Sequence, residues 1–260
     1  PYEETIIRWR GDGNIWANNP EFAQPTWSNL FRRERLPETI VLDSRDGTAL
    51  KDVEPAGGEM NRVTILFPVE YDYGAYPQDL VVNIYSQYQE KTPFITLTWV
   101  TPDGREVPLD TFTATSEHRY SFEWQYYNDR QNLLEVRSGP PPWEDLFVQP
   151  DGTSERVLQG QYQVRLEGFV FEEEADIDAE LVLYGQVHGL AGTDDMGRDL
   201  TLALLWGTPF SLAFGLLGAF GTGLLAMSLA AMAVWFGGWV DGLIQRITEI
   251  NMLLPALPIA

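Results

Sequence analysis

The chain contains no cysteine among its 260 residues. That absence excludes disulfide bonds, thiolate catalysis, zinc sites built on cysteine and iron–sulfur clusters. Basic residues are scarce as well, with 17 Lys and Arg against 38 Asp and Glu, and the formal net charge is −21. Because nucleic-acid phosphates are held mainly by Lys and Arg, this composition argues against a nucleic-acid partner.

The first residues also lack the features of a natural start. Pro1 stands where an initiator methionine would, and no basic and apolar signal peptide follows it. We therefore expect a processed or partial chain.

Charged residues are missing altogether from Leu200 to Val240. A membrane-crossing helix needs about 20 mainly apolar residues, so we predict a transmembrane helix over 208–236. The alternative is a helix buried in a soluble core, but such helices are shorter and usually keep a polar face. Beyond residue 199 the charged side chains are Asp241, Arg246 and Glu249, which sum to −1. The remaining −20 lies on residues 1–199, and it favours an extracytoplasmic position for that part of the chain.

The acidic part is dominated by short segments that alternate apolar and polar residues. Examples are the apolar positions Val63, Ile65, Phe67 and Val69 of one segment. Such alternation, bounded by turn-forming residues, is typical of β-strands. We predict a mainly β extracytoplasmic domain, a β-sandwich over 38–187, followed by α-helical transmembrane segments.

Residues 1–37 show no regular spacing of apolar residues, of either the strand or the helix type. Turn formers such as Gly11-Asp12-Gly13 and Asn18-Asn19-Pro20 alternate with scattered aromatic residues. The aromatic residues are Trp9, Trp16, Phe22, Trp27 and Phe31. We expect an extended arm that is held against the domain by these side chains.

Catalytic or metal-binding chemistry finds little support in the sequence. The densest run of acids, Glu172 to Glu180, is able to bind calcium but lacks the spacing of an EF-hand loop. A solvated strand face is the simpler explanation. His118 and His188 lie far apart, with no serine in a nucleophile-elbow setting. We therefore predict no enzyme activity and no catalytic, cofactor-binding or metal-ligating residue.

The predicted span has small residues at helical spacing. Gly215, Ala219 and Gly223 lie four residues apart and so share one helix face. Small residues at this spacing let a second membrane helix approach closely. We predict that the span packs against other spans through this face.

A motif precedes the span at residues 188–207, where the chain begins His-Gly-Leu-Ala-Gly-Thr-Asp-Asp-Met-Gly-Arg-Asp. It resembles the HPLGTDxxGRD segment at the second span of the inner-membrane permease subunits of dipeptide, oligopeptide and nickel ABC importers. The matching residues are His188, Gly192, Thr193, Asp194, Gly197, Arg198 and Asp199. Ala203 and Pro209 stand where the family has arginine, so the contacts of those arginines are not expected here.

A second block of matches follows the span, where the family has FGGWxD and MR elements. The corresponding residues here are Gly237, Gly238, Trp239, Asp241, Arg246 and Glu249, the last in place of the usual Asp. We expect 237–249 to form a cytoplasmic elbow helix in which Arg246 pairs with Glu249. Residues 250–260 then begin the next transmembrane helix.

The resemblance covers about residues 188–260 and implies a multi-pass subunit of the inner or plasma membrane. Its implied partners are a second permease subunit, ATP-binding subunits, an extracytoplasmic substrate-binding protein and the lipid bilayer. The chain itself needs no cofactor, because ATP is bound by a partner subunit. The sandwich then corresponds to a large extracytoplasmic insertion, in a fragment that lacks the first span and the EAA loop that docks the ATPase.

Two alternatives remain open. The first is a permease-derived assembly subunit of a membrane complex, with the sandwich as its interaction module. The second is a membrane-anchored carbohydrate-binding or glycan-cleaving sandwich, since exposed tryptophans stack on sugar rings and paired carboxylates serve as glycosidase acid and base. The Asp and Arg residues of the motif are expected to serve ion pairing and helix capping before any direct role in transport.

Overall fold

The computed structural model describes residue 9 and residues 13–58, 60–125, 146–148 and 157–253. It divides into two compact units, Pro1–Leu202 and Ala203–Ala260. We call the first unit the head.

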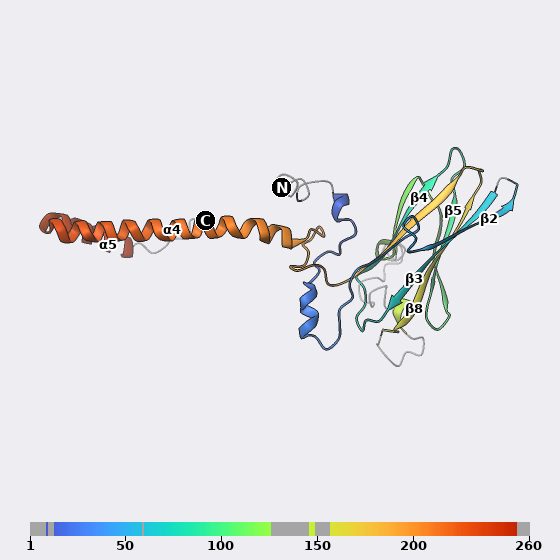
Figure 1. Cartoon of the computed structure of the whole chain (residues 1–260), viewed down its shortest axis with the longest axis horizontal. Helices are drawn as coiled ribbons and strands as arrows, with labels where there is room; N and C mark the ends of the chain where they lie inside the picture. The colour runs from blue at the N-terminus through green and yellow to red at the C-terminus, as the bar shows by residue number, and fades with distance from the viewer. Residues whose placement is uncertain (1–8, 10–12, 59, 126–145, 149–156, 254–260) are drawn as a thin grey trace, which may run out of the picture. The chain divides into compact units, whose positions relative to one another are not determined.

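Within the described residues, the head contains nine β-strands in two antiparallel sheets (Figure 1). The four-stranded sheet has the order β1-β9-β4-β7, and the five-stranded sheet has the order β2-β3-β8-β5-β6. The strands are β1 (Ile40–Asp43), β2 (Leu50–Gly57), β3 (Met60–Tyr71), β4 (Asp79–Gln87), β5 (Phe94–Val100), β6 (Glu106–Thr113), β7 (Glu117–Ser121), β8 (Gly160–Val170) and β9 (Asp176–Tyr184). The predicted β-sandwich is confirmed.

The core of the sandwich follows from the alternation along its strands. Val63, Ile65, Phe67 and Val69 all point inward from β3 and are buried. An aromatic cluster closes one end of the core, with ring centroids 4.9–6.3 Å apart. Its members are Tyr71, Trp99, Phe147 and Tyr162. The indole of Trp99 donates a hydrogen bond to the Leu146 carbonyl at 3.1 Å, so its one polar group is satisfied inside the core.

Residues 13–37, which with residue 9 make up the described part of the arm, contain two short 3₁₀ helices, η1 (Gly13–Trp16) and η2 (Thr26–Phe31). The backbone of the arm is paired with the segment that leaves β9: the Gln24 amide donates to Gln186, and the His188 amide donates to Gln24. The expectation that aromatic side chains hold the arm down is wrong for Phe22 and Phe31, which are exposed, whereas the half-exposed Trp27 does donate an indole hydrogen bond to the Leu190 carbonyl. Backbone hydrogen bonds, rather than exposed rings, hold residues 13–37 against the rest of the head.

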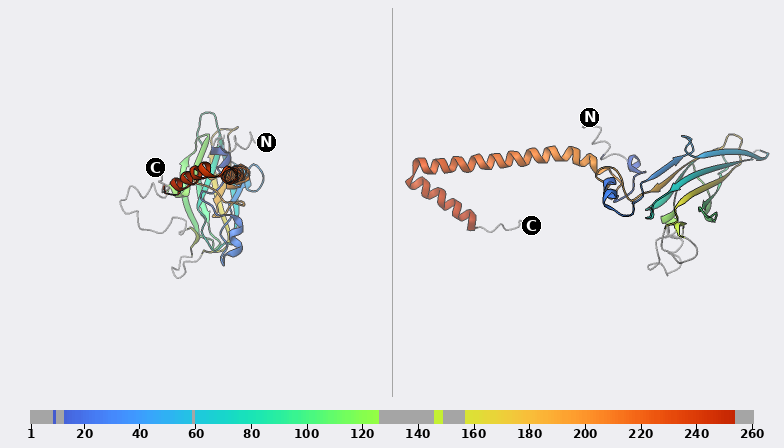
Figure 2. Two further views of the ribbon diagram at one scale, coloured as in Figure 1. Left: turned by 90° about the vertical axis from the view of Figure 1, so that its left-hand side faces the viewer. Right: turned by 60° about the horizontal axis from the view of Figure 1, so that its bottom comes forward.

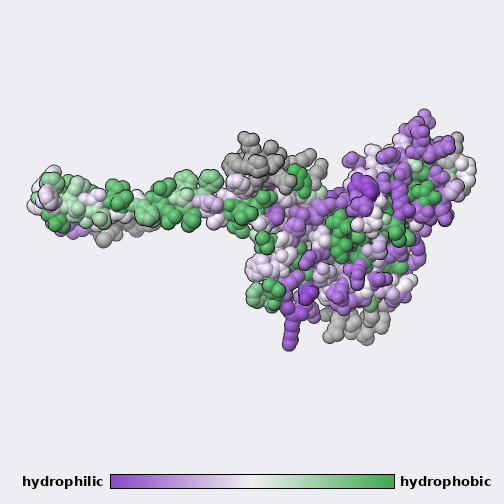
Figure 3. All heavy atoms as spheres, in the orientation of Figure 1, coloured by the Kyte–Doolittle hydropathy of each residue, from purple (hydrophilic) through white to green (hydrophobic). Residues whose placement is uncertain are grey.

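The second unit consists of helix α4 (Leu200–Phe236), which starts at the last residues of the head, and helix α5 (Gly238–Leu253). Within the described residues, α4 is the one helix long and apolar enough to cross a membrane by its length and composition. It begins at Leu200, before the predicted start at 208. Figure 3 shows hydrophobic side chains along its exposed surface, whereas hydrophilic ones cover much of the head.

The two helices meet at a corner formed by Gly237 and Gly238 (Figure 2). Both glycines have left-handed backbone angles, with φ of 56° and 52°, which other residues rarely adopt. Helix α5 runs without a break through residue 250, where a new span was predicted to begin, and residues 254–260 lie outside the described part. The predicted Arg246–Glu249 ion pair is absent from the described part of α5, because two exposed side chains gain little from pairing in water.

Candidate functional site at the pre-span loop

The loop of residues 188–199, which we call the pre-span loop, is built on glycines that no other residue can replace without strain. Gly192 has φ of 77°, and a Cβ at this position would overlap the carbonyl oxygen of Ala23. Gly197 has φ of 70°, and a Cβ there would lie 2.9 Å from the Asn19 carbonyl oxygen. The two motif glycines therefore allow the arm and the loop to approach backbone to backbone.

Thr193 locks this contact. Its side chain is buried and donates a hydrogen bond to the Pro20 carbonyl at 2.6 Å. The same hydroxyl accepts from the Ala23 amide at 2.9 Å, while the Thr193 amide donates to the Ala23 carbonyl at 3.1 Å. A serine would keep the hydroxyl, but a valine would leave two buried backbone groups unpaired.

Asp194 organises the turn that follows. Its carboxylate accepts hydrogen bonds from the amides of Met196 and Arg198 and from the Arg198 guanidinium at 2.7 Å. Burial alone would raise the pKa of Asp194, but these amides and the guanidinium together lower it below its usual value. The guanidinium of Arg198 also lies 4.6 Å from the centroid of the Trp9 ring. Arg198 thus joins the loop to a residue near the other end of the head's sequence.

Asp199 caps helix α4. Its carboxylate accepts the Thr201 amide at 2.8 Å, which is the usual bond of an N-cap side chain. The Leu200 amide, at the first position of the helix, donates to the Gly192 carbonyl at 3.0 Å. The loop therefore holds Leu200 and Thr201, the first residues of α4, which still belong to the head.

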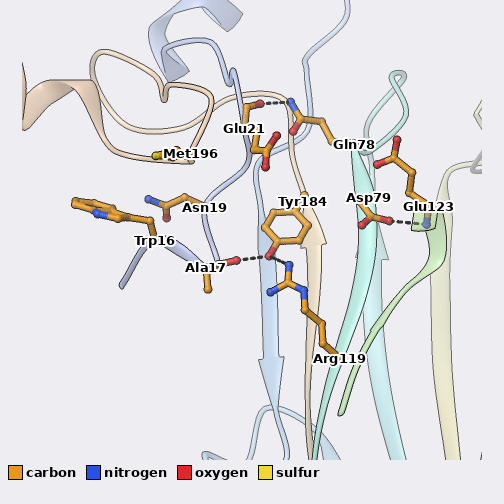
Figure 4. Close-up of a pocket in the computed structure, with 10 residues that line it drawn as sticks. All are labelled: Trp16, Ala17, Asn19, Glu21, Gln78, Asp79, Arg119, Glu123, Tyr184 and Met196. Carbon is orange, nitrogen blue, oxygen red and sulfur yellow. Dashed lines mark hydrogen bonds between the residues drawn. The ribbon is translucent and has the colours of Figure 1, made fainter. Parts of the chain in front are cut away.

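A cavity of about 260 Å³ lies beside the loop, between the arm and the four-stranded sheet (Figure 4). Its lining comes from the arm, from β4, β7 and β9, and from the pre-span loop. The lining residues are Trp16, Ala17, Asn19, Glu21, Gln78, Asp79, Arg119, Glu123, Tyr184 and Met196. Segments that are far apart in the sequence thus meet at this point.

The cavity is polar and mainly acidic. Burial is the main cause that raises the pKa of Asp79, although Ser121 and the Glu123 amide donate hydrogen bonds to it. Burial, and then the negative charges of Asp79 and Glu21, raise the pKa of Glu123. Arg119 is the one basic residue in the lining, and it donates to the Tyr184 hydroxyl at 3.1 Å. With three carboxylates and one guanidinium, the cavity favours cationic groups over anionic ones.

The acidic run near β9 is occupied by internal contacts. Glu172 accepts the backbone amides of Gln89, Glu90 and Lys91 at 2.6–2.7 Å. Lys51 forms ion pairs with Asp176 and Asp178, each at 2.8 Å. In the described part of the chain, no group of three or more His, Asp or Glu side chains is placed to hold a metal ion.

The residues predicted in the second unit lie in open surroundings. A Cβ at Gly215, Gly223, Gly237 or Gly238 would meet no atom within 4 Å, and Trp239 is 80% exposed. The Asp241 carboxylate accepts the Gln245 side-chain amide at 3.3–3.4 Å. Helix α4 therefore presents its small residues with no packing partner among the described residues.

No protein-family model matches the chain. Curated relatives match a stretch of it: a peptidoglycan transport system permease protein, YejE, of Agrobacterium fabrum is 38% identical over 66 residues, which is 25% of this chain and 17% of that protein. A dipeptide transport system permease protein, DppC, of Alkalihalophilus pseudofirmus is 35% identical over 69 residues, or 26% of this chain and 23% of that protein. The glutathione transport system permease protein GsiD of Pectobacterium atrosepticum is 32% identical over 69 residues, or 26% of this chain and 23% of that protein.

The chain thus spans less than a quarter of the length of these three relatives. Part of it is similar to peptide-transport permeases, and its remaining sequence is outside that similarity.

Solved structures give weaker similarities. TmCBM61 in complex with β-1,4-galactotriose is 11% identical with a TM-score of 0.25, covering 62% of this chain and 92% of that one. A structure described for carbohydrate-binding modules of the β-sandwich superfamily is 8% identical with a TM-score of 0.27, covering 65% of this chain and 62% of that one. TM-scores this low assign neither topology nor ligand.

The sequence identified the motif residues but not the residues that receive them. The arm, about 170 positions earlier in the chain, receives the motif: Asn19 donates to the Gly197 carbonyl, and the Pro20 and Ala23 carbonyls accept from Thr193. Their own composition gives no signal of this role beyond turn formation, because they contribute mostly backbone carbonyl and amide groups. The cavity residues Asp79 and Glu123 were missed for a different reason: they are 44 positions apart in the sequence, and single acidic residues form no local pattern.

Proposed function

We propose that this chain is part of a transmembrane permease subunit of an ABC importer for peptides or similar small solutes. The observation that carries the proposal is the pre-span loop. The residues that match the importer motif are those whose glycines, threonine and carboxylates lock the loop to the head and cap α4. The stretch shared with proteins named as peptide-transport permeases supports the same assignment.

In this proposal, α4 crosses the membrane and forms part of the translocation path. Its apolar side chains face lipid, and the face of Gly215, Ala219 and Gly223 packs against a helix of this subunit or of a second permease subunit. A partner ATPase supplies the energy, so no residue of this chain performs covalent chemistry. The head lies outside the cytoplasm, where an extracytoplasmic substrate-binding protein docks.

The pre-span loop then has a mechanical role. Alternating access requires that movements of α4 be transmitted to the parts of the complex outside the bilayer. A loop held by left-handed glycines, a buried threonine and the Asp194–Arg198 ion pair has little freedom to bend. It therefore moves with the first turn of α4 as one body.

The test replaces Arg198 with alanine in the full-length subunit, purified from its native membrane. We expect Arg198→Ala to lower the amount of assembled complex, measured by quantitative mass spectrometry of the copurifying subunits, with the KM of peptide uptake unchanged. Arg62→Ala is the matched control, because Arg62 also lies over an aromatic ring, that of Phe169, at 5.2 Å. The control should assemble normally.

Three results would change the proposal. Normal assembly of Arg198→Ala with an altered KM would assign the loop to substrate recognition. A wild-type complex that contains no ATPase would instead favour an assembly subunit that uses the permease scaffold. Binding of glycans by the wild-type chain, without any ATPase, would favour the carbohydrate-binding alternative.

A further inference from the structure

An exposed patch of apolar and basic residues lies on and after the η2 helix. Its apolar members are Trp27, Leu30 and Phe31, which are 52%, 81% and 83% exposed. Arg32, Arg33 and Arg35 follow them in the sequence, with Glu34 between the last two. We call the six residues the η2 patch: Trp27, Leu30, Phe31, Arg32, Arg33 and Arg35.

The apolar side chains of the patch are not accounted for by the fold of the head. The rings of Trp27 and Phe31 contact each other edge to face at 6.3 Å, which holds both on the surface. Figure 3 shows hydrophobic and hydrophilic side chains next to one another over this helix. An exposed aromatic cluster on a soluble domain usually marks a surface that binds something.

The basic side chains are equally unusual in this chain. Three of its 17 basic residues fall within four positions, while the head as a whole is strongly acidic. Arg32 donates to the Gln24 side chain, and in the described residues none of the three forms an ion pair. Arg33 and Arg35 line a concavity together with Glu34, Glu70 and Asp72. Among the described residues these two guanidinium groups form no ion pair, although three carboxylates share the concavity.

The patch is tied to the start of α4 by hydrogen bonds. The Trp27 indole donates to the Leu190 carbonyl at 2.9 Å, and the Thr26 amide donates to the Gly189 carbonyl at 3.0 Å. Two residues further on, the Gly192 carbonyl accepts from Leu200, the first residue of α4. All of these residues belong to the head. The patch thus lies at the end of the head from which the apolar helix leaves.

We propose that the η2 patch binds the surface of the bilayer that α4 crosses. Trp27, Leu30 and Phe31 insert at the boundary between headgroups and acyl chains, where aromatic rings are favoured. The arginines contact lipid phosphates, to which anionic lipids contribute further attraction. This inference rests on the membrane crossing in the proposed function, and it adds a second contact between head and lipid.

The second contact has a mechanical consequence. The rest of the head carries excess negative charge and is repelled by an anionic surface. A basic and aromatic patch next to the pre-span loop attracts one defined side of the head to the lipid. It thereby fixes which face of the sandwich is presented to a binding protein.

The absence of cysteine makes a direct test possible in the full chain. Single cysteines at Leu30, Val53 and Leu225 each carry an environment-sensitive fluorophore, and the labelled chains are placed in nanodiscs with phosphatidylglycerol. Quenching is measured with doxyl-labelled lipid and, separately, with aqueous iodide. Val53 is a matched control on the head, since it is an exposed aliphatic residue on β2, and Leu225 reports the span itself.

We expect the label at Leu30 to be quenched by doxyl lipid at least about twofold more than the label at Val53, and to be protected from iodide. The label at Leu225 should be quenched by lipid in every case. Quenching at Leu225 without quenching at Leu30 would overturn this inference alone. Absence of lipid quenching at Leu225 would overturn the membrane crossing and, with it, the proposed function.

A label at Leu30 that is protected from iodide but not quenched by lipid would also overturn the inference, because a protein surface would then cover the patch. The charge is tested separately with Arg32→Gln, Arg33→Gln and Arg35→Gln combined. We expect this triple variant to lose about half or more of the lipid quenching at Leu30 in anionic nanodiscs. Equal quenching before and after the change would show that the arginines do not contact lipid.

Discussion

The head and helix α4 satisfy their side chains in opposite ways. In the head, apolar residues of the strands are buried between two sheets, and polar residues of the pre-span loop are paired with the arm or with one another. In α4, large side chains such as Phe214, Phe220 and Val234 are 69–87% exposed. The head carries its own apolar environment, whereas α4 requires one from outside. Substitutions in the head should therefore change its stability to unfolding, whereas substitutions in α4 should change membrane insertion.

The largest effect is expected at Gly192. Gly192→Val places a branched side chain at a left-handed φ and against the Ala23 carbonyl, so the head should lose more than about 3 kcal/mol of stability. Gly47→Val is the matched control, since Gly47 has φ of 83° but no atom within 4 Å of a Cβ. It should lose only about 1–2 kcal/mol. Denaturant unfolding of the head, followed by tryptophan fluorescence, compares the two, and equal losses would refute the close contact.

The next largest effect is expected from a substitution in α4 that leaves the head unchanged. Leu225→Asp should raise the free energy of membrane insertion by about 3 kcal/mol and leave the unfolding of the head unchanged. Leu50→Asp is its control, because both leucines are 64% exposed but Leu50 lies on β2 of the head. Carbonate extraction of membranes measures the inserted fraction. Full retention of the Leu225→Asp chain in the membrane would contradict the assignment of α4 as a span.

Asp194→Asn tests the loop that joins the regions. It removes the ion pair with Arg198 and weakens two amide hydrogen bonds, at an expected cost of about 2 kcal/mol at neutral pH. The folded pKa of Asp194 lies below the unfolded value, so its contribution is present above the unfolded pKa and is lost as pH falls through the folded one. The difference from wild type should therefore shrink below about pH 4.

The control for this variant is Asp195→Asn, since Asp195 is exposed and makes no hydrogen bond with the described residues through its carboxylate. Unfolding curves at several pH values decide the matter. A pH-independent difference between Asp194→Asn and wild type would show that geometry, and not charge, accounts for the loss.

The smallest effect is a gain. Glu123→Gln removes one of three acids around the cavity, and we expect about 0.5 kcal/mol of added stability at neutral pH. Because the folded pKa of Glu123 is raised, its carboxylate destabilises the head above that pKa, and the penalty disappears as pH falls through it. The gain should vanish on acidification. Glu54→Gln, on exposed β2, should change nothing, and a loss of stability in Glu123→Gln would show that its charge is used.

Regular alternation is clearest on strands that have one buried and one more exposed face. The inner strand β3 alternates buried and exposed residues along most of its length, so its pattern is regular. The edge strands β2 and β6 were not predicted, because most of their residues are exposed or only half buried. Alternation of apolar and polar residues arises where one face of a strand is buried, so an edge strand with little buried surface does not show it.

Strand β4 has apolar residues on both faces. Val82 and Ile84 face the main core, while Val81 belongs to a second, smaller cluster.

The candidate site divides in the same way. The motif residues could be singled out from the sequence, since seven of them lie within twelve positions. Their partners on the arm were not found, because a backbone carbonyl such as that of Pro20 or Ala23 is present at every residue and leaves no trace in the sequence. The exposed aromatic residues of the arm were misjudged for a related reason: composition records that a ring is apolar, not whether it faces the core.

The sequence by itself determined the sandwich, the apolar helix and the motif between them, because a strand with one buried face and a long uncharged apolar run are both visible as local patterns. Only the tertiary structure decided that the arm receives the pre-span loop, that Asp176 and Asp178 of β9 pair with Lys51 and that Trp27, Leu30 and Phe31 face outward. Those outcomes depend on contacts between residues that are more than a hundred positions apart or on the direction of a side chain. Local patterns carry neither kind of information.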